Sequence, residues 1–320
     1  MAVVVVLVLL GGGLAAAAAA APGAPGEVPG EATAQGYLLR ALGLLRAYSI
    51  NRDRIDWPRA EADAVRSVAG AAAPSGAYSA IRTVIADLGN RHTMLLDPAR
   101  ARPPAAGTIE VPAGWAKDGI GMPTVPGLVA DSEGERRYVD AGVAALRSAE
   151  AGASCGWVVD LRGNTGGNMW PMLTVLAPLL GDGDVGSFAG PGVGRSVWSI
   201  GDGQALLDGE ALTAEANPVR LSRSGPPVAV LASRNTASSG EATLIAFRGR
   251  ARTAVFGEPT AGYATGNRVF DLSDGAKLLV TTVVDVDRTS RVYGAAPIEP
   301  DFPAGDPEAA ARKWLRSHCG

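Results

Sequence analysis

Two stretches of sequence decide the fold expected for this chain: Asp160-Leu161-Arg162-Gly163-Asn164-Thr165-Gly166-Gly167 and Asn235-Thr236-Ala237-Ser238-Ser239-Gly240-Glu241. Each follows an apolar run typical of a strand and precedes a run typical of a helix. The adjacent glycines leave the backbone N–H groups of the first stretch unobstructed. The second stretch places a serine at a helix N-terminus, where free N–H groups and a partial positive charge occur.

Each loop has an ordinary structural explanation when it is taken alone. Serine before a helix is most often an N-cap, and paired glycines most often mark a turn. A serine hydroxyl becomes a useful nucleophile only with a base in hydrogen-bond reach and with donors aimed at the developing oxyanion. Because the two stretches together offer a hydroxyl and bare amides, we expect them to meet as an oxyanion hole facing a nucleophile.

Composition limits both the class of protein and the candidate bases. The 320 residues suffice for one large domain or two modest ones. With 29 basic and 32 acidic residues, the net charge is −3, and no basic stripe appears that would indicate a nucleic-acid partner. The candidate bases are few: histidine occurs only at His92 and His318, and lysine only at Lys117, Lys277 and Lys313.

The N-terminus predicts export. Residues 1–21 combine a valine- and leucine-rich run with an alanine-rich stretch, as in a signal peptide, although the usual basic start is missing. A membrane anchor is the alternative, but the strongly apolar part is short for a span. Residues 22–30 are rich in Pro, Gly and Ala and predict a linker. We therefore expect a secreted or extracytoplasmic protein.

The remaining chain divides into a helical N-terminal region, residues 31–105, and a larger core, residues 106–320. Apolar spacing and caps at Asp56 and Gly89 indicate helices in the first part. From about Gly107 onward, strands are expected to alternate with helices. The predicted core elements are strands at Gly156–Val159, Pro227–Leu231 and Thr253–Gly257, helices at Trp170–Leu180 and Glu241–Phe247, a hairpin turning at Asp274-Gly275, and a final helix capped by Asp306.

The chain has only two cysteines, Cys155 and Cys319. An even count in an exported protein predicts one disulfide, which would fix the C-terminal helix; two independent thiols are the alternative. No spacing of cysteines and histidines suits a metal, so no metal site is expected.

Three ordered motifs resemble the tail-specific, or carboxyl-terminal processing, serine protease family, taken broadly to include the tricorn protease core. The resemblance covers roughly Gly107 to Asp301. The three motifs are the whole run Asp160–Gly167; the segment of Thr236, Ala237, Ser238 and Glu241; and the segment of Gly257, Glu258, Pro259, Thr260 and Gly262. The later pair Pro300-Asp301 also resembles the family's sequence near the end of the sheet.

The resemblance implies a fold and a set of roles. The fold is the α/β, Clp protease/crotonase-like spiral, with a helical N-terminal region beside the peptidase catalytic core. Ser238 would be the nucleophile, and the oxyanion donors would be the N–H of Ser239 and one from Gly166 or Gly167. The substrate class is a peptide or protein, and no metal or nucleotide cofactor is implied.

One departure from the family changes the expected base. The bacterial processing branch carries its basic lysine at the position of Tyr263, and tyrosine, with a pKa near 10, is a poor base. The tricorn-like branch uses a histidine from the N-terminal part, which matches His92, with Arg91 where that branch has a serine. We therefore expect His92 to be the general base, against the alternative of a structural histidine. Three residues are open as the group that orients it: Thr93, Asp285 and Glu299.

The sequence thus predicts an exported serine peptidase acting through a Ser238 acyl-enzyme with His92 as base. The stretch from His92 to Trp157 is too short for a substrate-recruiting PDZ domain, so none is expected. The alternative is a catalytically weak or inactive binding protein for a lipophilic ligand, because the resemblance extends to the interphotoreceptor retinoid-binding proteins.

Overall fold

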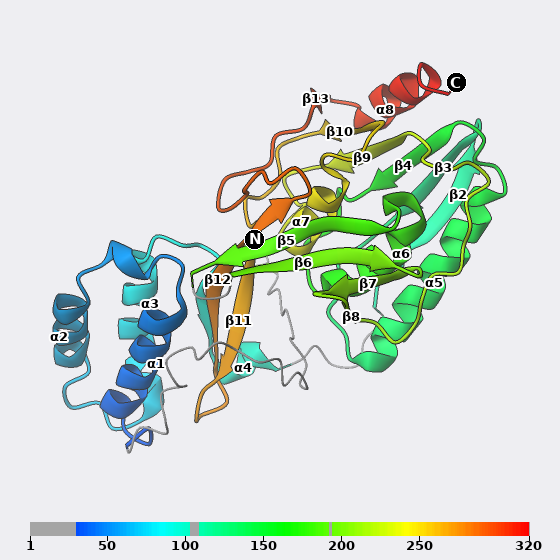
Figure 1. Ribbon diagram of the computed structural model, residues 1–320. Coiled ribbons are helices and arrows are strands. Elements are labelled where there is room, and N and C mark those ends of the chain that lie inside the picture. Colours follow the sequence, from blue (N-terminus) through cyan, green and yellow to red (C-terminus); the bar gives the residue numbers. More distant parts are fainter. Residues whose placement is uncertain (1–29, 103–108, 192–193, 320) are drawn as a thin grey trace.

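The computed structural model describes residues 30–102, 109–191 and 194–319. The predicted signal peptide and residues 22–29 of the linker lie outside the described residues. The chain folds as mixed α/β, with a helical N-terminal region beside a larger core that contains two sheets (Figure 1). This is the class of fold that the sequence predicts.

The helical region follows the predicted caps. Helix α2 begins after Asp56, whose carboxylate accepts the Arg59 N–H over 3.3 Å. Gly89 takes a φ of 66° just beyond α3, a conformation that suits glycine at a helix end. The elements of this part are α1 (Ala34–Tyr48), η1 (Arg52–Arg54), α2 (Trp57–Ser67), η2 (Pro74–Ala77), α3 (Tyr78–Asp87), β1 (Met94–Leu96) and α4 (Pro98–Ala101).

A mainly parallel sheet positions the two motif loops. Its order is β13-β10-β9-β4-β3-β2, and only the β2–β3 pair is antiparallel. Asp160 at the end of β4 pairs with Leu231 near the end of β9, so the loops that follow these strands leave the same edge. The strands are β2 (Ala113–Lys117), β3 (Ile120–Thr124), β4 (Gly156–Asp160), β9 (Val228–Ala232), β10 (Thr253–Gly257) and β13 (Phe302–Pro303).

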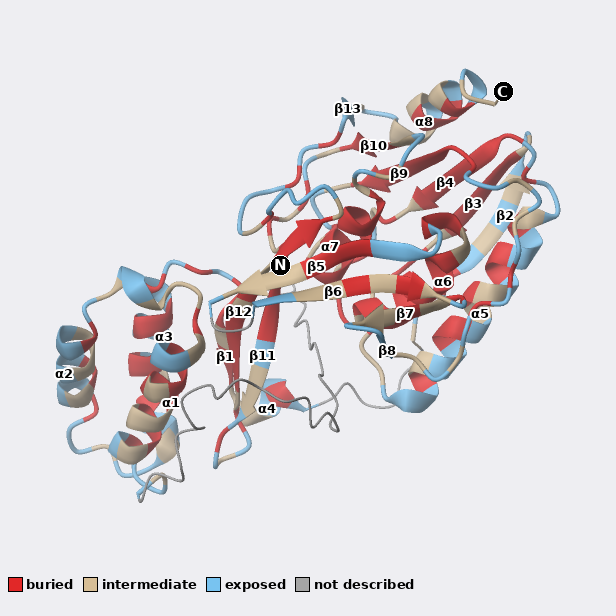
Figure 2. Ribbon diagram, in the orientation of Figure 1, coloured by how far each residue is buried: buried red, intermediate tan, exposed pale blue. Residues whose placement is uncertain are grey.

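Helices cover both faces of this sheet. Helix α8 packs on one face, whereas α5 and α7 pack on the other with α6 beside them. Helices α6 and α7 also contact the second sheet, and nearly every residue of both is buried (Figure 2). A helix that is apolar on all sides suits this sandwiched position. The bounds are α5 (Ser132–Glu150), α6 (Met169–Leu180), α7 (Ser239–Phe247) and α8 (Pro307–Arg316).

The second sheet is antiparallel, and the sequence predicted only part of it. The expected hairpin at Asp274-Gly275 is present, but residues 183–211 form four successive strands, so the expectation of alternating strands and helices is wrong there. Glycines at the ends of β5 and β6 interrupt the alternation of apolar and polar residues by which strands are predicted. The bounds are β5 (Gly183–Gly190), β6 (Gly194–Gly201), β7 (Gln204–Leu207), β8 (Glu210–Ala211), β11 (Thr265–Asp271) and β12 (Lys277–Asp287).

The helical region and the core share the β11–β12 hairpin. Strand β1 pairs with β12, and apolar side chains of the hairpin join the core of the helical region. The hydroxyl groups of Tyr37 and Tyr78 both donate to the Asp274 carboxylate at the hairpin turn, over 2.8 and 2.5 Å. Burial acts to raise the pKa of Asp274, but these bonds and the Ala276 N–H outweigh it and lower that pKa. The domain boundary near residue 105 stays a prediction.

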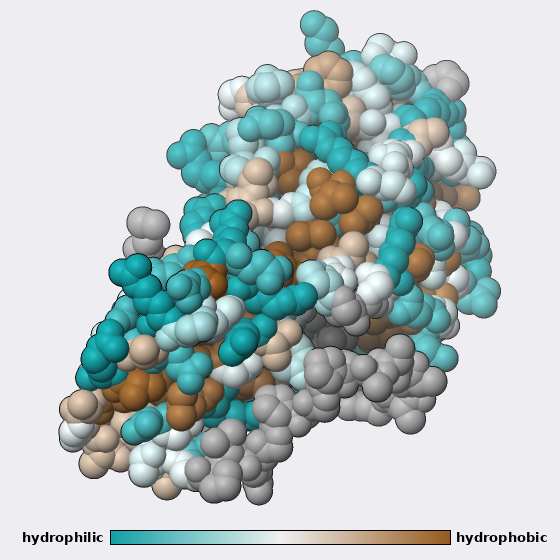
Figure 3. All heavy atoms as spheres, turned by 60° about the vertical axis from the view of Figure 1, so that its left-hand side comes forward, coloured by the Kyte–Doolittle hydropathy of each residue, from teal (hydrophilic) through white to brown (hydrophobic). Residues whose placement is uncertain are grey.

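On the face shown in Figure 3, most side chains are hydrophilic, and apolar residues gather near the middle and at the lower left. In the described part of the chain, we find no helix that combines the length and the apolar character needed to cross a membrane.

A disulfide joins the last described residue to the core. The Sγ atoms of Cys155 and Cys319 are bonded, and their Cα atoms lie 4.7 Å apart. Cys155 immediately precedes β4, and Cys319 follows α8. The bond therefore holds α8 against the parallel sheet, in the pairing that the cysteine count predicts.

We predict that Asp274→Asn lowers the free energy of unfolding at pH 7 by about 1 kcal/mol, because it weakens charge-assisted bonds to two tyrosines. Urea unfolding measures this. The difference from wild type should shrink as pH falls below about 3.9, where the free carboxylate titrates and the lowered pKa ceases to favour the folded state. Asp271→Asn, on the same hairpin but exposed, is the control. Equal losses in both variants would contradict a specific role for Asp274.

Candidate active site

Side-chain and backbone hydrogen bonds join the two motif loops. The Thr236 Oγ1–H donates to the Leu161 carbonyl over 2.8 Å, and the Ala237 N–H donates to the Asn164 carbonyl over 3.0 Å. The Ser239 hydroxyl also donates to the Gly167 carbonyl. The structure therefore brings the predicted nucleophile loop and the glycine loop into direct contact.

Ser238 occupies a strained position at the start of α7. Its φ of 51° and ψ of −115° lie outside the regions that residues with a side chain ordinarily adopt. Such a conformation costs on the order of 1–3 kcal/mol and persists only where its surroundings enforce it. Ser238 is buried, with 3% of its surface exposed. Ser238 is the N-cap residue at this sharp turn and forms a capping box with Glu241 in the first turn of α7.

The buried carboxylate of Glu241 enforces that turn. It accepts the Ser238 N–H over 2.9 Å, the Gly262 N–H over 2.9 Å and the Tyr263 N–H over 2.7 Å. The Thr260 hydroxyl donates to it as well. Burial raises the pKa of Glu241, and these four bonds partly offset that effect. One side chain therefore ties the nucleophile loop to residues 260–263.

Only one of the two candidate glycines keeps a free amide. The Gly166 N–H donates to the Asn164 Oδ1 over 3.0 Å and is therefore occupied. Within the described residues, the N–H groups of Gly167 and Ser239 have no protein acceptor. Gly167 has a φ of 118°, and a Cβ there would lie 1.8 Å from the Leu128 carbonyl oxygen, so only glycine fits. The amides of Gly167 and Ser239 are the pair available to an oxyanion.

His92 lies buried between the helical region and the core. Its Nδ1 is 2.7 Å from the Thr265 Oγ1, and its Nε2 is buried with no hydrogen-bond partner in the described structure. The Asn90 Oδ1 accepts the His92 N–H, and the Asn267 side chain donates to the His92 carbonyl. Burial lowers the pKa of His92 to about 4, so the ring is neutral at physiological pH.

A continuous set of contacts connects His92 with Ser238. The ring of His92 meets the ring of Tyr263 edge-on, with centroids 5.2 Å apart. The Tyr263 N–H and the Ser238 N–H share the same Glu241 oxygen. These contacts link the two predicted residues only indirectly, because the described structure has no hydrogen bond between the His92 ring and the Ser238 hydroxyl.

None of the three residues considered for orienting His92 bonds to its ring in the described structure. Thr93 pairs with Thr281, Glu299 is exposed, and Asp285 is buried. Burial and the nearby Glu241 raise the pKa of Asp285 well above its usual value, which favours the neutral carboxyl. The residue at the ring nitrogen is Thr265, at the start of β11. No local sequence pattern points to Thr265, because 173 positions separate it from His92.

Two other residues that could act as a base, Lys277 and His318, form contacts away from the nucleophile loop. Lys277 forms an ion pair with Asp271 over 2.5 Å at the far end of the hairpin. The Nδ1 of His318 lies 2.7 Å from the Trp314 carbonyl at the end of α8. Neither residue contacts the nucleophile loop in the described structure.

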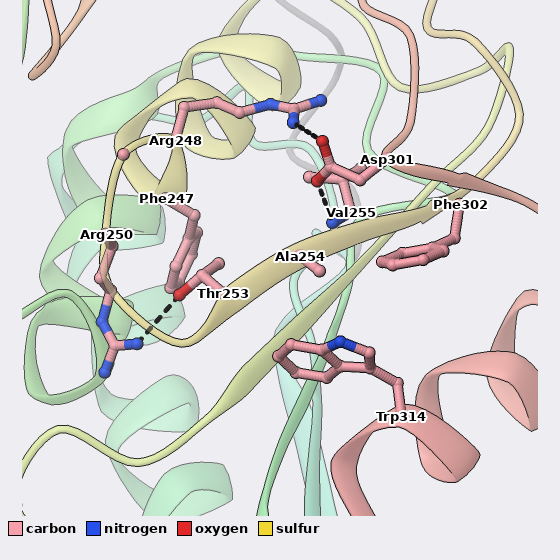
Figure 4. Close-up of a pocket in the computed structure, with 10 residues that line it drawn as sticks. Phe247, Arg248, Arg250, Thr253, Ala254, Val255, Asp301, Phe302 and Trp314 are labelled. Carbon is pink, nitrogen blue, oxygen red and sulfur yellow. Dashed lines mark hydrogen bonds and ion pairs between the residues drawn. The ribbon is translucent and has the colours of Figure 1, made fainter. Parts of the chain in front are cut away.

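A cavity of about 440 Å³ lies elsewhere, between the C-terminal end of α7, β10, β13 and α8 (Figure 4). Arg248 spans part of it, donating to Asp301 over 2.5 Å, and the same carboxylate accepts the Val255 N–H. Phe302 and Trp314 line the other side. Because this cavity adjoins the start of β10, whereas Ser238 follows the end of β9, it is not the candidate site.

A strained serine, free backbone amides and a buried neutral histidine are the features expected of a serine-peptidase site. The family comparison agrees: residues 132–304 match peptidase family S41, and the chain belongs to that family.

Two curated relatives match part of the chain. One is the nisin-resistance protein of Lactococcus lactis subsp. lactis, 33% identical over 162 residues, or 51% of this chain and 50% of the relative. The other is the chloroplastic carboxyl-terminal-processing peptidase 2 of Arabidopsis thaliana, 28% identical over 154 residues, or 46% of this chain and 27% of the relative. The matches thus span half or less of these relatives.

Solved structures show the same fold along most of the chain. A lipoprotein from Streptococcus agalactiae aligns with a TM-score of 0.77 and 24% identity, covering 89% of this chain and 97% of that one. The photosystem II D1 C-terminal processing protease aligns with a TM-score of 0.62 and 18% identity, covering 90% of this chain and 97% of that one. At these identities the likeness establishes the fold.

We predict that Thr265→Val lowers kcat for peptide hydrolysis about fivefold, since loss of one hydrogen bond of about 1 kcal/mol releases the His92 ring. Thr265→Ser keeps a hydroxyl and should restore most of the rate. Steady-state kinetics with one fluorogenic peptide compares the three proteins. If the valine variant keeps the wild-type rate, Thr265 does not position His92.

Proposed function

We propose that this chain is a serine peptidase in which Ser238 attacks the substrate carbonyl. The His92 Nε2 takes the hydroxyl proton and returns it to the leaving amine, and the peptide C–N bond breaks to leave an acyl group on the Ser238 Oγ. A water molecule, deprotonated by the same nitrogen, then attacks the acyl carbonyl, the ester C–O bond to Ser238 breaks, and the proton returns to the Ser238 Oγ. The amides of Gly167 and Ser239 stabilise the oxyanion in both steps.

The observation that carries this proposal is the state of the His92 ring. One nitrogen is held by Thr265, while the other is buried without a partner. A buried nitrogen that forms no hydrogen bond is costly, and such exceptions are concentrated at functional sites. When the Thr265 oxygen accepts the Nδ1–H, the lone pair of Nε2 is free to accept a proton. That is the tautomer that a general base requires.

The relatives suggest where such a peptidase acts and what to test first. One is named for nisin resistance, and one structural neighbour is described as a lipoprotein. We propose that this protein acts outside the cytoplasm on peptides, and nisin is the first substrate to assay. The Cys155–Cys319 disulfide suits an oxidising compartment.

The sequence also allowed a non-catalytic protein that binds a lipophilic ligand. A fluorophosphonate separates the two, because it reacts covalently only with an activated serine. We expect wild type to be labelled and Ser238→Ala to lose both labelling and hydrolysis while its thermal unfolding stays near wild type. Ser239→Ala is the matched control: it removes the adjacent hydroxyl and its bond to Gly167 but should still be labelled. Labelling lost only in the Ser239 variant would assign the nucleophile to Ser239 instead.

The lowered pKa of His92 predicts how the rate of hydrolysis depends on pH. A base must be neutral, and burial lowers the pKa of His92 from 6.5 to about 4. We therefore expect kcat/KM, which reports on the free enzyme, to stay high at pH 6 and to fall as pH drops through about 4. Initial rates measured between pH 3.5 and 8 under conditions of retained folding test this. A midpoint near 6.5 would show that His92 is hydrated in solution, or that another group is the base.

A further inference from the structure

The cavity near the C-terminal end of α7 lies at an open edge of the parallel sheet. Strand β13 pairs with only the last two residues of β10, so Thr253, Ala254 and Val255 have no strand on that side in the described structure. Backbone groups alternate sides along a strand. The N–H groups of Thr253 and Val255 therefore face the open edge together.

A protein carboxylate already occupies one of these two positions. The Val255 N–H donates to the Asp301 Oδ2 over 2.7 Å, and the Arg248 Nη1 donates to the Asp301 Oδ1 over 2.5 Å (Figure 4). Hydrogen bonds from a guanidinium to a carboxylate are charge-assisted and stronger than neutral ones. One carboxylate thus satisfies an edge N–H and a guanidinium at once.

The position two residues earlier has the same donors but no carboxylate. The Thr253 N–H has no protein acceptor in the described structure. The Arg250 Nη1 donates to the Thr253 Oγ1 over 3.0 Å, which holds the guanidinium beside that edge. Its other bonds go to the carbonyls of Ala251 and Pro226 and brace the loop. Among the described residues, no carboxylate lies within 4.0 Å of Arg250, so its charge is not paired there.

The surroundings of Arg250 favour an anion. Burial, with Arg288 and Arg252 nearby, lowers the pKa of Arg250 to about 10, so the guanidinium is still charged at neutral pH. A bound anion offsets both the lost hydration and the repulsion between the guanidinium groups. In the same cavity wall, the Nε of Arg248 is buried without a hydrogen-bond partner in the described structure.

The side of the cavity away from the arginines is aromatic. Phe302 and Trp314 line it, and both pack on Phe256, with ring centroids 4.9 and 5.9 Å away (Figure 4). Phe302 is unusual for a large apolar side chain, because 45% of its surface is exposed. The volume of about 440 Å³ lies in the range of small-molecule sites. The cavity therefore suits a molecule with an anionic end and a flat apolar end.

We propose that this cavity binds a small organic acid, with its carboxylate at Arg250 and the Thr253 N–H and its flat apolar body against Trp314 and Phe302. The carboxylate repeats at Thr253 the contacts that Asp301 makes at Val255. Binding of the acid is independent of the proposed peptidase function, because the cavity adjoins the start of β10, whereas Ser238 follows the end of β9.

Isothermal titration calorimetry on the full chain tests the proposal. The probes are naphthoate, its neutral counterpart naphthamide, and acetate, which has the carboxylate without the aromatic body. Arg250→Met removes the charge from the cavity. Arg223→Met is the matched control, because Arg223 also donates to two backbone carbonyls, those of Ser154 and Cys319, but does not line the cavity.

We expect naphthoate to bind about tenfold more tightly than naphthamide, as a charge-assisted bond allows, and acetate to bind more weakly than naphthoate. Arg250→Met should abolish the advantage of the acid over the amide, and Arg223→Met should keep it. Trp314→Ala should weaken both aromatic probes by a similar factor. Equal Kd values for acid and amide, an advantage that survives Arg250→Met, or no binding of naphthoate at millimolar concentration would overturn the proposal.

A second measurement needs no variant, in case Arg250→Met does not fold. Crystals of the wild-type protein soaked with bromonaphthoate locate the acid by the anomalous signal of bromine. We expect bromine beside Phe302 and Trp314 and the carboxylate within hydrogen-bond distance of Arg250 and the Thr253 N–H. Bromonaphthoate bound only elsewhere, or in this cavity with its carboxylate turned away from Arg250, would refute the assignment.

Discussion

The buried carboxylate of Glu241 is the interaction on which the candidate site depends. An ionised carboxylate is costly to bury unless hydrogen bonds surround it, and Glu241 receives three from backbone N–H groups and one from a hydroxyl. These donors come from the nucleophile turn and from residues 260–263, so satisfying one side chain brings both segments together. The strained backbone of Ser238 is held by the same contact.

The topology explains how distant segments reach this carboxylate. The parallel strands β4 and β9 end side by side, which places the glycine loop against the serine loop. The β11–β12 hairpin then reaches out to the helical region, where β1 pairs with β12 and His92 meets Thr265. The proposed nucleophile thus comes from the core and the proposed base from the helical region, with the hairpin as the element common to both. The Tyr37 and Tyr78 bonds to Asp274 hold the other end of that hairpin.

Features with a local cause were predictable from the sequence. Helix caps such as Asp56, the buried strand at Gly156–Val159 and the two motif loops all depend on neighbouring residues, and the structure contains them. Features that depend on distant partners were not. Three such features are Thr265 at the His92 ring, the occupied amide of Gly166 and the strands of residues 183–211. They depend on tertiary contacts, which produce no hydrophobic periodicity in the sequence. The roles of Ser238 and His92 rest on the family resemblance and on the geometry around them.

The most direct test of the account is a crystal structure of the protein after reaction with a fluorophosphonate. The account predicts phosphorus bonded to the Ser238 Oγ, with its free oxygen about 3 Å from the N–H groups of Gly167 and Ser239. It also predicts the His92 Nε2 within hydrogen-bond reach of the adduct. An adduct on Ser239, or a phosphonyl oxygen turned away from both amides, would contradict it.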